Sequence, residues 1–285
     1  MDWNRDDIDW HSFDVHQWRR DMIDPFDDHS FVVPAYGKSA HLERCLESLR
    51  AQTHPSPIVI STSTPFRGLS ELADRFQARV TVHDPNAGIG NDWNNAIRSA
   101  DSNWITLAHQ DDVYLPDFAH ATKSAIRSNQ NALLVFTGYR ELLGDRVIPG
   151  GTLLLAKRAL QEFAFLGRSS VMQSRAKRRL LAFGCAIPCP SVTMRRLPGF
   201  VFSEKLAVNL DWDAWLRLAC LEGAFVRVNR KLMLHRLHAG SETFNGTQAG
   251  VRQREDQQLF EQLWPKIIAR FFTTLYSMSY RRALN

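Results

Sequence analysis

The sequence predicts an α/β fold in which a mostly parallel central sheet is flanked by helices. Short apolar, β-rich runs alternate with amphipathic segments from residue 30 to about residue 137. That β-α-β-α order favours parallel strands with helices on both faces of the sheet. The 285 residues, of which 44% are hydrophobic and 23% charged, are enough for one large domain or two small ones with a substantial core.

Five strands and four helices are expected in this first half. The strands cover 31–33, 57–61, 79–84, 104–108 and 132–136, and the helices cover 39–52, 68–77, 91–100 and 116–129. Apolar residues recur at helical spacing in these helices, and Pro116 suits the start of the fourth. Because ligands of such sheets bind at the carboxyl ends of the strands, we expect the site at that edge.

The second half is less regular. Residues 138–190 are rich in expected loops and in basic residues. Further on, we expect strands at 190–195, 225–229 and 231–237, a helix at 209–223, and one or two helices within 250–283. These elements predict a smaller second sheet and C-terminal helices. The segment 264–282 is apolar and basic enough to touch a membrane surface, although an ordinary packed C-terminal helix is the simpler interpretation.

The net charge of +5 hides an asymmetry. Residues 1–28 carry −6, so the remainder carries +11, and residues 156–180 hold seven Lys or Arg against one Glu. This basic stretch suits a phosphate-bearing partner or an anionic membrane surface, or it is simply a solvated basic helix face. It lacks interleaved aromatics and any known nucleic-acid motif, so we expect no nucleic-acid partner.

The sequence predicts a cytoplasmic protein. No run approaches the roughly 18–20 apolar residues of a membrane span, and the acidic, aromatic start does not resemble a secretion signal. The four cysteines form no C-x-x-C pair or dense framework, which favours reduced thiols. The sequence also lacks a P-loop, and the dinucleotide-like Gly88-Ile89-Gly90 has Trp93 where a third glycine belongs.

An acidic pair follows the fourth expected strand. His109 and Gln110 precede Asp111 and Asp112 at the carboxyl end of residues 104–108. Two carboxylates at a strand end suit Mg²⁺ or Mn²⁺ that also takes phosphate oxygens. The alternative is that they cap the next helix or bind loop amides.

A second acidic pair lies in the expected helix 209–223. Helical spacing places Asp211 on the side of Trp215, and Asp213 one turn before Arg217, with which it should form an ion pair. Apolar surroundings raise the pKa of a carboxylate, so Asp211 is the better candidate for a general base, with helix N-capping as the alternative. His235 and His238 are three apart on an expected strand, so we expect at most one of them in the site.

Four segments, in order, resemble family 2 glycosyltransferases of the GT-A fold. FVVPAYGKSAHLERCLESLRAQTHP resembles the opening strand, Pro-x-Tyr turn and helix; NAGIGNDWNNAIRSADSNWITLAHQDDVYLPDF resembles the segment leading to the D-x-D metal motif. NLDWDAWLRLA resembles the helix of the catalytic base, and HRLHAGSET the later segment near the diphosphate. The resemblance covers most of residues 30–245, with His109 in the place of the first Asp of D-x-D.

The resemblance implies roles for individual residues. Asp211 would be the general base, and Asp111 and His238 would hold Mn²⁺ or Mg²⁺. The nucleotide-sugar site would comprise Pro34, Tyr36, Ser61, Thr62, Ser63, Gly88, Asn94, His109, Gln110, Asp111 and Asp112. The acceptor and diphosphate side would comprise Cys189, Ser191, Asp213, Arg236 and His238. The hydroxyls of residues 61–64 stand where an Asp often meets the nucleobase, so a UDP-sugar is expected but with a weaker base contact.

The resemblance also implies an activity and a division of the chain. We expect an inverting, metal-dependent hexosyl transfer from a nucleotide-diphospho-sugar to a hydroxyl of a glycan or lipid-linked glycan, as in polysaccharide biosynthesis. The basic stretch and the apolar, basic C-terminal segment, and not the resemblance, allow peripheral contact at the inner membrane face. The rivals are a non-catalytic nucleotide-sugar-binding relative and a metal-dependent nucleotidyltransferase. The expected parts are an N-terminal extension (1–29), a nucleotide-sugar half (30–137), an acceptor and catalytic half (138–245) and a C-terminal helical segment (246–285).

Overall fold

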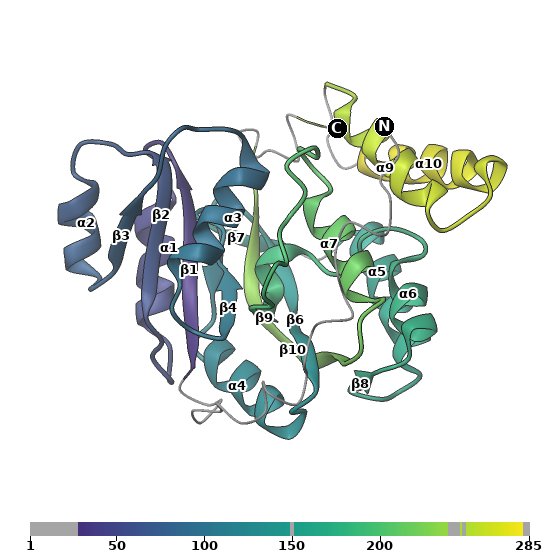
Figure 1. The fold of residues 1–285 in the computed structure, drawn as a ribbon, viewed down its shortest axis with the longest axis horizontal. Coiled ribbons are helices and arrows are strands. Elements are labelled where there is room, and N and C mark those ends of the chain that lie inside the picture. The colour runs from purple at the N-terminus through teal and green to yellow at the C-terminus, as the bar shows by residue number, and fades with distance from the viewer. Residues whose placement is uncertain (1–27, 149–150, 239–245, 247–248, 282–285) are drawn as a thin grey trace.

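The computed structural model describes residues 28–148, 151–238, 246 and 249–281 (Figure 1). Its strands are β1 His29–Tyr36, β2 Ile58–Thr64, β3 Arg79–Val82, β4 Trp104–Leu107, β5 Val113–Tyr114, β6 Ala132–Leu143, β7 Arg146–Ile148, β8 Ser170–Val171, β9 Val192–Arg195 and β10 Ala224–Leu237. Its helices are α1 Leu42–Arg50, α2 Leu69–Arg75, α3 Ile89–Ser99, α4 Phe118–Ser128, α5 Thr152–Phe165, α6 Ser174–Leu181, α7 Leu210–Leu218, α9 Val251–Glu261 and α10 Lys266–Arg281.

The strands form one ten-stranded sheet with the order β3-β2-β1-β4-β9-β6-β10-β5, while β7 pairs with β6 and β8 with β10. The first four strands in this order are parallel to one another, as the β-α-β-α pattern predicts. β9 runs antiparallel between β4 and β6. The chain moves outward from β1 to β3 and then returns to β4, so β1 and β4 flank a switch point, where such sheets bind ligands.

Strand β1 is buried on both faces. Val32 packs with Val59 and Leu107 in the larger apolar cluster, whereas Phe31 and Val33 belong to a second cluster across the sheet. Alternate residues of a strand point to opposite faces, so helices must cover both. This burial explains why the opening strand reads as a continuous apolar run.

The basic segment 138–190 is more regular than expected. β6 continues to Leu143, and β7, α5, β8 and α6 follow, so the prediction of a loop-rich segment is wrong. In α5, Leu154, Ala164 and Phe165 are buried while Leu155 and Phe163 are exposed. Apolar residues therefore occur on both sides of this helix, which obscures the amphipathic period in the sequence.

Two further predictions about strands need correction. The strands expected at 225–229 and 231–237 are one strand, β10, with register shifts between Val228 and Met233 in its pairing with β6. The strands of the second half also do not form a separate smaller sheet, because β9, β6 and β10 hydrogen-bond into the main one. The shifts let one strand bend where the sequence suggested a break.

Two of the expected boundaries between the parts of the chain cut across strands of the sheet. The expected boundary at 137/138 lies inside β6, so both halves contribute to one sheet. His29 already belongs to β1, and the rest of the expected 1–29 extension, apart from Asp28, lies outside the described residues. α9 and α10 form the expected C-terminal helical segment, on the opposite side of the molecule from β3 and α2 (Figure 1). No helix within the described residues is both long and apolar enough to span a membrane.

Candidate active site

The acidic pair lies in the turn between β4 and β5, and its two members have different surroundings. Asp112 is fully buried, and its Oδ1 accepts a hydrogen bond of 2.8 Å from the Arg236 amide. The ring of His235 contacts the same carboxylate, with Nδ1 3.1 Å from Oδ1. Asp112 therefore ties the β4–β5 turn to β10.

Asp111 is more accessible and contacts a different histidine. Nε2 of His238 lies 2.7 Å from Oδ2 of Asp111. Burial by itself would raise the pKa of Asp111, but the hydrogen bond from His238 and the nearby rings of His109 and His235 lower it to about 2. Asp111 is therefore ionised at neutral pH.

Both histidines of the 235–238 segment contact the acidic pair, so the expectation that only one could enter the site is wrong. β10 ends at Leu237, and the strand alternation therefore does not extend to His238. Asp112 raises the pKa of His235, although burial alone would lower it.

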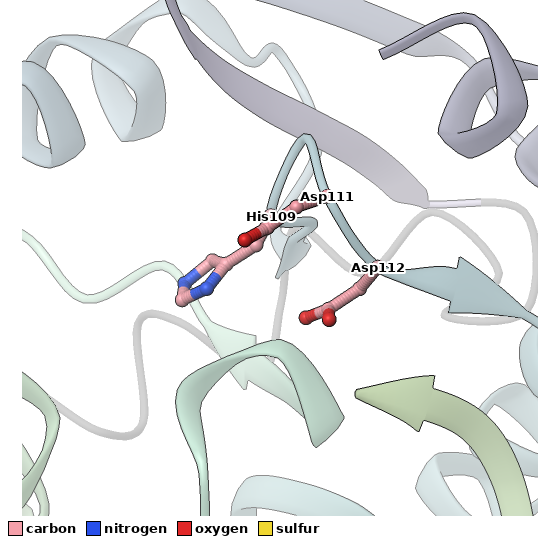
Figure 2. Close-up of side chains that lie close together, drawn as sticks. All are labelled: His109, Asp111 and Asp112. Atoms are coloured by element: carbon pink, nitrogen blue, oxygen red, sulfur yellow. The ribbon is translucent and has the colours of Figure 1, made fainter. Parts of the chain in front are cut away.

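His109 completes a group of potential metal ligands. Ligand atoms of His109, Asp111 and Asp112 all lie within 4.8 Å of one another, and the three side chains extend from one turn (Figure 2). Nε2 of His109 is buried without a hydrogen-bond partner among the described residues. This nitrogen and the Asp111 carboxylate suit a divalent cation, whereas Asp112 already has protein partners.

The ends of β1 and β4 are joined at the switch point. The Tyr36 amide donates to Oε1 of Gln110 at 3.2 Å, and the Gly37 amide donates to Oγ1 of Thr64 at 2.7 Å. Pro34 is paired in register with Ser61 on β2, while the Tyr36 side chain is 59% exposed. An exposed aromatic ring beside the acidic turn is free to stack on a ligand.

The neighbouring strand end of β2 carries two buried hydroxyls, Oγ of Ser61 and of Ser63, that have no hydrogen-bond partner among the described residues. Thr62, between the two serines, accepts a hydrogen bond from the Thr64 amide. Beside them, Nε2 of His83 after β3 lies 4.0 Å from Oδ1 of Asp92 in α3, and neither atom has a hydrogen bond within the described part of the chain. Buried polar atoms usually have hydrogen-bond partners, so the two serine hydroxyls indicate a ligand site. Sequence reasoning missed His83 and Asp92, although His83 follows a parallel strand and could have been considered on that ground.

Helix α3 begins beside these atoms. Gly88 caps it with φ +97°, and a Cβ there would meet nothing within 4 Å, so the entrance to the helix is open. Asn94 is 2% exposed and hydrogen-bonds both the amide and the carbonyl of Phe202. A Cβ on Gly90 would lie 2.5 Å from the Ser203 carbonyl oxygen. We therefore assign Asn94 a positioning role, since it holds α3 against the 202–204 segment.

Asp211 lies in the first turn of α7, in an apolar setting. The helix N-cap is Asn209, so Asp211 does not cap it. Its carboxylate accepts hydrogen bonds from the amides of Trp212 at 2.7 Å and Cys189 at 3.2 Å. Burial raises the pKa of Asp211, although these hydrogen bonds and the Lys157 charge oppose the rise. A desolvated carboxylate with a raised pKa suits a general base.

Other residues expected on the acceptor side are engaged with the protein. Asp213 forms the expected ion pair with Arg217 at 2.9 Å. Ser191 is fully buried and donates to the Pro188 carbonyl, and the Arg236 guanidinium donates to the carbonyls of Asp111 and Gly144. These contacts shape the site around Asp111 and Asp211.

The segment Cys189–Ser191 connects the two acidic regions. The Cys189 amide binds Asp211, and the Tyr114 hydroxyl, just after the acidic pair, donates to the Pro190 carbonyl at 2.8 Å. Cys185 adds a weak thiol contact of 3.6 Å to Asp211. One short segment therefore sets the positions of both the base candidate and the acidic turn.

The basic stretch is not one solvated face. Lys177 is fully buried, and its ammonium donates to the carbonyls of Leu221 and Gly223. Burial lowers the pKa of Lys177 to about 8. Arg178 donates to the Gln262 carbonyl. Part of this positive charge therefore holds the fold together and is not available to a partner.

Comparison with known proteins places the chain in a family. Residues 30–197 match the family described as "Glycosyl transferase family 2". A Haemophilus influenzae protein described as "Uncharacterized glycosyltransferase" is 25% identical over 109 residues. That match covers 38% of this chain and 37% of the relative's own length.

Solved structures share the fold at low sequence identity. S. aureus TarS 1–349 aligns with a TM-score of 0.61 and 11% identity, covering 86% of this chain and 69% of that one. The mannosyltransferase PcManGT from Pyrobaculum calidifontis, in complex with GDP-Man and Mn²⁺, gives 0.58 and 14%, covering 88% and 70%.

Glucosyl-3-phosphoglycerate synthase from Mycobacterium tuberculosis, in complex with Mn²⁺ and UDP-Glc, is a third solved structure with this fold. It aligns with a TM-score of 0.53 and 17% identity, covering 82% of this chain and 78% of that one. The α/β architecture is therefore the GT-A fold that the sequence predicted. The family match covers more than half of the 285 residues. The chain belongs to glycosyl transferase family 2.

Proposed function

We propose that this protein is an inverting glycosyltransferase that moves a hexosyl group from a nucleotide-diphospho-sugar to an acceptor hydroxyl. The observation that carries the proposal is the pairing of an ionised Asp111 with a desolvated Asp211 around the segment Cys189–Ser191. Asp111 suits the diphosphate end of a donor, and Asp211 suits proton removal from an acceptor.

In the proposed reaction Asp211 takes the proton of the acceptor hydroxyl. The hydroxyl oxygen forms a bond to the anomeric carbon as the bond between that carbon and the diphosphate oxygen breaks. The nucleoside diphosphate leaves with the bonding electron pair, and the anomeric configuration inverts. A divalent cation, Mn²⁺ or Mg²⁺, held by Asp111 and His238 would neutralise charge on the diphosphate. Mn²⁺ accompanies the donors in two of the similar structures.

We assign the donor to the ends of β1, β2, β3 and α3. The buried hydroxyls of Ser61 and Ser63, which have no hydrogen-bond partner among the described residues, support a polar ligand there, and the exposed Tyr36 ring supports stacking. A UDP-sugar is the proposed donor. The buried hydroxyls can accept a hydrogen bond from a uracil, more weakly than a carboxylate would.

We place the acceptor on the side of Asp211 and Cys189, and we propose that it is a glycan or lipid-linked glycan in cytoplasmic polysaccharide biosynthesis. Lys157 lies close enough to Asp211 to oppose the rise of its pKa. A cation beside the base would favour an acceptor that carries negative charge near the reacting hydroxyl.

The test is nucleoside diphosphate release from UDP-, GDP- and dTDP-sugars with Mn²⁺ or Mg²⁺, with and without glycan acceptors. The proposal expects release with one donor and loss of release in Asp111→Asn and Asp211→Asn. Donor binding by calorimetry without any release would favour a non-catalytic sugar-nucleotide-binding relative. Release of pyrophosphate from a nucleoside triphosphate would instead favour a nucleotidyltransferase.

A further inference from the structure

Helix α10 carries a stripe of exposed apolar side chains. Ile267 is 84% exposed, Phe271 64%, Leu275 55% and Met278 49%. Steps of four, four and three residues place these side chains above one another on one side of the helix. Large contiguous apolar patches on a protein surface usually mark an interaction site. We call these four residues the α10 stripe.

The opposite face of α10 holds the helix in place. Ala269, Thr273 and Ser277 are buried, and the Phe272 ring lies 5.3 Å from that of Phe183. The helix is therefore fixed by its inner face, and its outer face is presented in a defined orientation. The stripe is a surface of a packed helix and not the side of a loose tail.

The charge around the stripe is positive. Lys266 and Arg270 are exposed on the same helix, and the sequence of α10 contains no Asp or Glu. A suitable partner must offer an apolar interior and negative charge at its surface. A bilayer with anionic lipids has both properties, since apolar side chains enter the acyl boundary while cations meet the headgroups.

We propose that α10 is a peripheral membrane-docking helix that lies in the interface of an anionic bilayer through the α10 stripe. A second copy of the chain is a poorer partner, because self-association would bring the cations of two α10 helices together. The proposal goes beyond the proposed reaction, since docking needs neither a donor nor a catalytic acid.

The location of α10 gives docking a consequence for the active site. On its inner face the Tyr276 ring lies 6.2 Å from that of Trp212, the residue after Asp211. A Cβ on Gly184 would lie 3.0 Å from the Tyr276 ring, and Cys185 follows with its thiol contact to Asp211. Docking through α10 would therefore hold the acceptor side of the active site near the lipid surface.

The test is flotation of the full chain with vesicles of phosphatidylcholine alone or of phosphatidylcholine with about 30% phosphatidylglycerol, which supplies an anionic surface. We expect binding to the anionic vesicles only. The double variant Phe271→Ser/Leu275→Ser and the single variant Arg270→Glu should each lower the partition coefficient about tenfold or more. Val82→Ser is the matched control, because Val82 is 52% exposed on β3, far from α10 (Figure 1).

Three results would overturn the proposal. The first is unchanged vesicle binding by the stripe variants when circular dichroism shows that they are folded. The second is a dimer of the wild-type chain in sedimentation that the stripe variants abolish, without any vesicle binding. The third is a wild-type chain that binds no vesicles and in which carbodiimide cross-links Lys266 to a carboxylate of residues 2–28. That result would make the acidic N-terminal segment the partner of α10. Nucleoside diphosphate release is measured separately without vesicles, so failure of docking and failure of the proposed reaction can be told apart.

Discussion

Nε2 of His238 lies 2.7 Å from Oδ2 of Asp111, which brings a residue just beyond the end of β10 against the turn that follows β4. The two residues are 127 positions apart in the sequence. Both are ordinary ligands of transition-metal ions, and both side chains remain partly accessible. Their contact is where we expect a divalent cation to be bound.

Asp111→Asn and His238→Ala should each weaken metal binding without unfolding the protein. Loss of one ligand should raise the Mn²⁺ concentration for half-maximal nucleoside diphosphate release about 10–100-fold, by analogy with the cost of altered metal surroundings. Chelation with EDTA should stop release by the wild type, and added Mn²⁺ should restore it. Release that is insensitive to EDTA would contradict the metal assignment.

Asp112→Asn should act on stability more than on metal affinity. The variant weakens the hydrogen bonds of a fully buried carboxylate to the Arg236 amide and to His235. Loss of a hydrogen bond to a charged group costs about 1.5–3 kcal/mol. We expect thermal unfolding several degrees below the wild type, and a smaller decrease for Asp111→Asn, because the contact of Asp111 with His238 is partly accessible and therefore screened by water. Equal thermal shifts in both variants would contradict the different roles of the two acids.

Asp211→Asn should remove activity with a smaller loss of stability than Asp112→Asn. Loss of a general base lowers kcat roughly 10²–10⁴-fold. An Asn side chain loses one of the hydrogen bonds from the Trp212 and Cys189 amides, but the raised pKa of Asp211 means that burying its ionised form already costs free energy, and the neutral side chain removes that cost. Asp213→Asn, on the same helix, is the control, since it should remove only the ion pair with Arg217.

The pH profile of kcat/KM should have an acid limb set by Asp211. The base works in its ionised form, and burial raises its pKa above the ordinary value of 3.8. Activity should therefore fall as the pH decreases, beginning at a higher pH than an exposed aspartate would give. The free energy of unfolding has the opposite pH dependence. The contribution of Asp211 to it decreases as the pH rises from 3.8 through the folded pKa of Asp211. An acid limb below pH 3.8 would exclude Asp211 as the base.

The free energy of unfolding of the wild type should increase at alkaline pH relative to a variant without Lys177. Burial lowers the folded pKa of Lys177 from 10.5 to about 8, so between these values the unfolded chain binds more protons than the folded one. The free energy of unfolding of the wild type should therefore increase relative to Lys177→Met as the pH rises from about 8 toward 10.5. Urea unfolding at several pH values measures this difference. Lys266→Met is the exposed control, and a difference that falls with pH would contradict the burial effect.

The sequence by itself determined much of the fold and the candidate acids. The alternation of apolar runs and amphipathic segments predicts the parallel strands around β1, because that pattern depends only on local periodicity and burial. Asp111 and Asp112 follow a strand, and Asp213 lies one turn before Arg217, so their positions could be read from nearby residues.

Only the tertiary structure decided which side chains meet. Strand pairing between β6 and β10 brings His235 and His238 to the acidic turn, and the Cys189–Ser191 segment brings its amide to Asp211. The tertiary structure also buries Lys177, which lies in a basic stretch that the sequence alone suggests is solvated. These contacts join residues far apart in the chain, and sequence periodicity reports which face of an element is buried but not which distant residue packs against it.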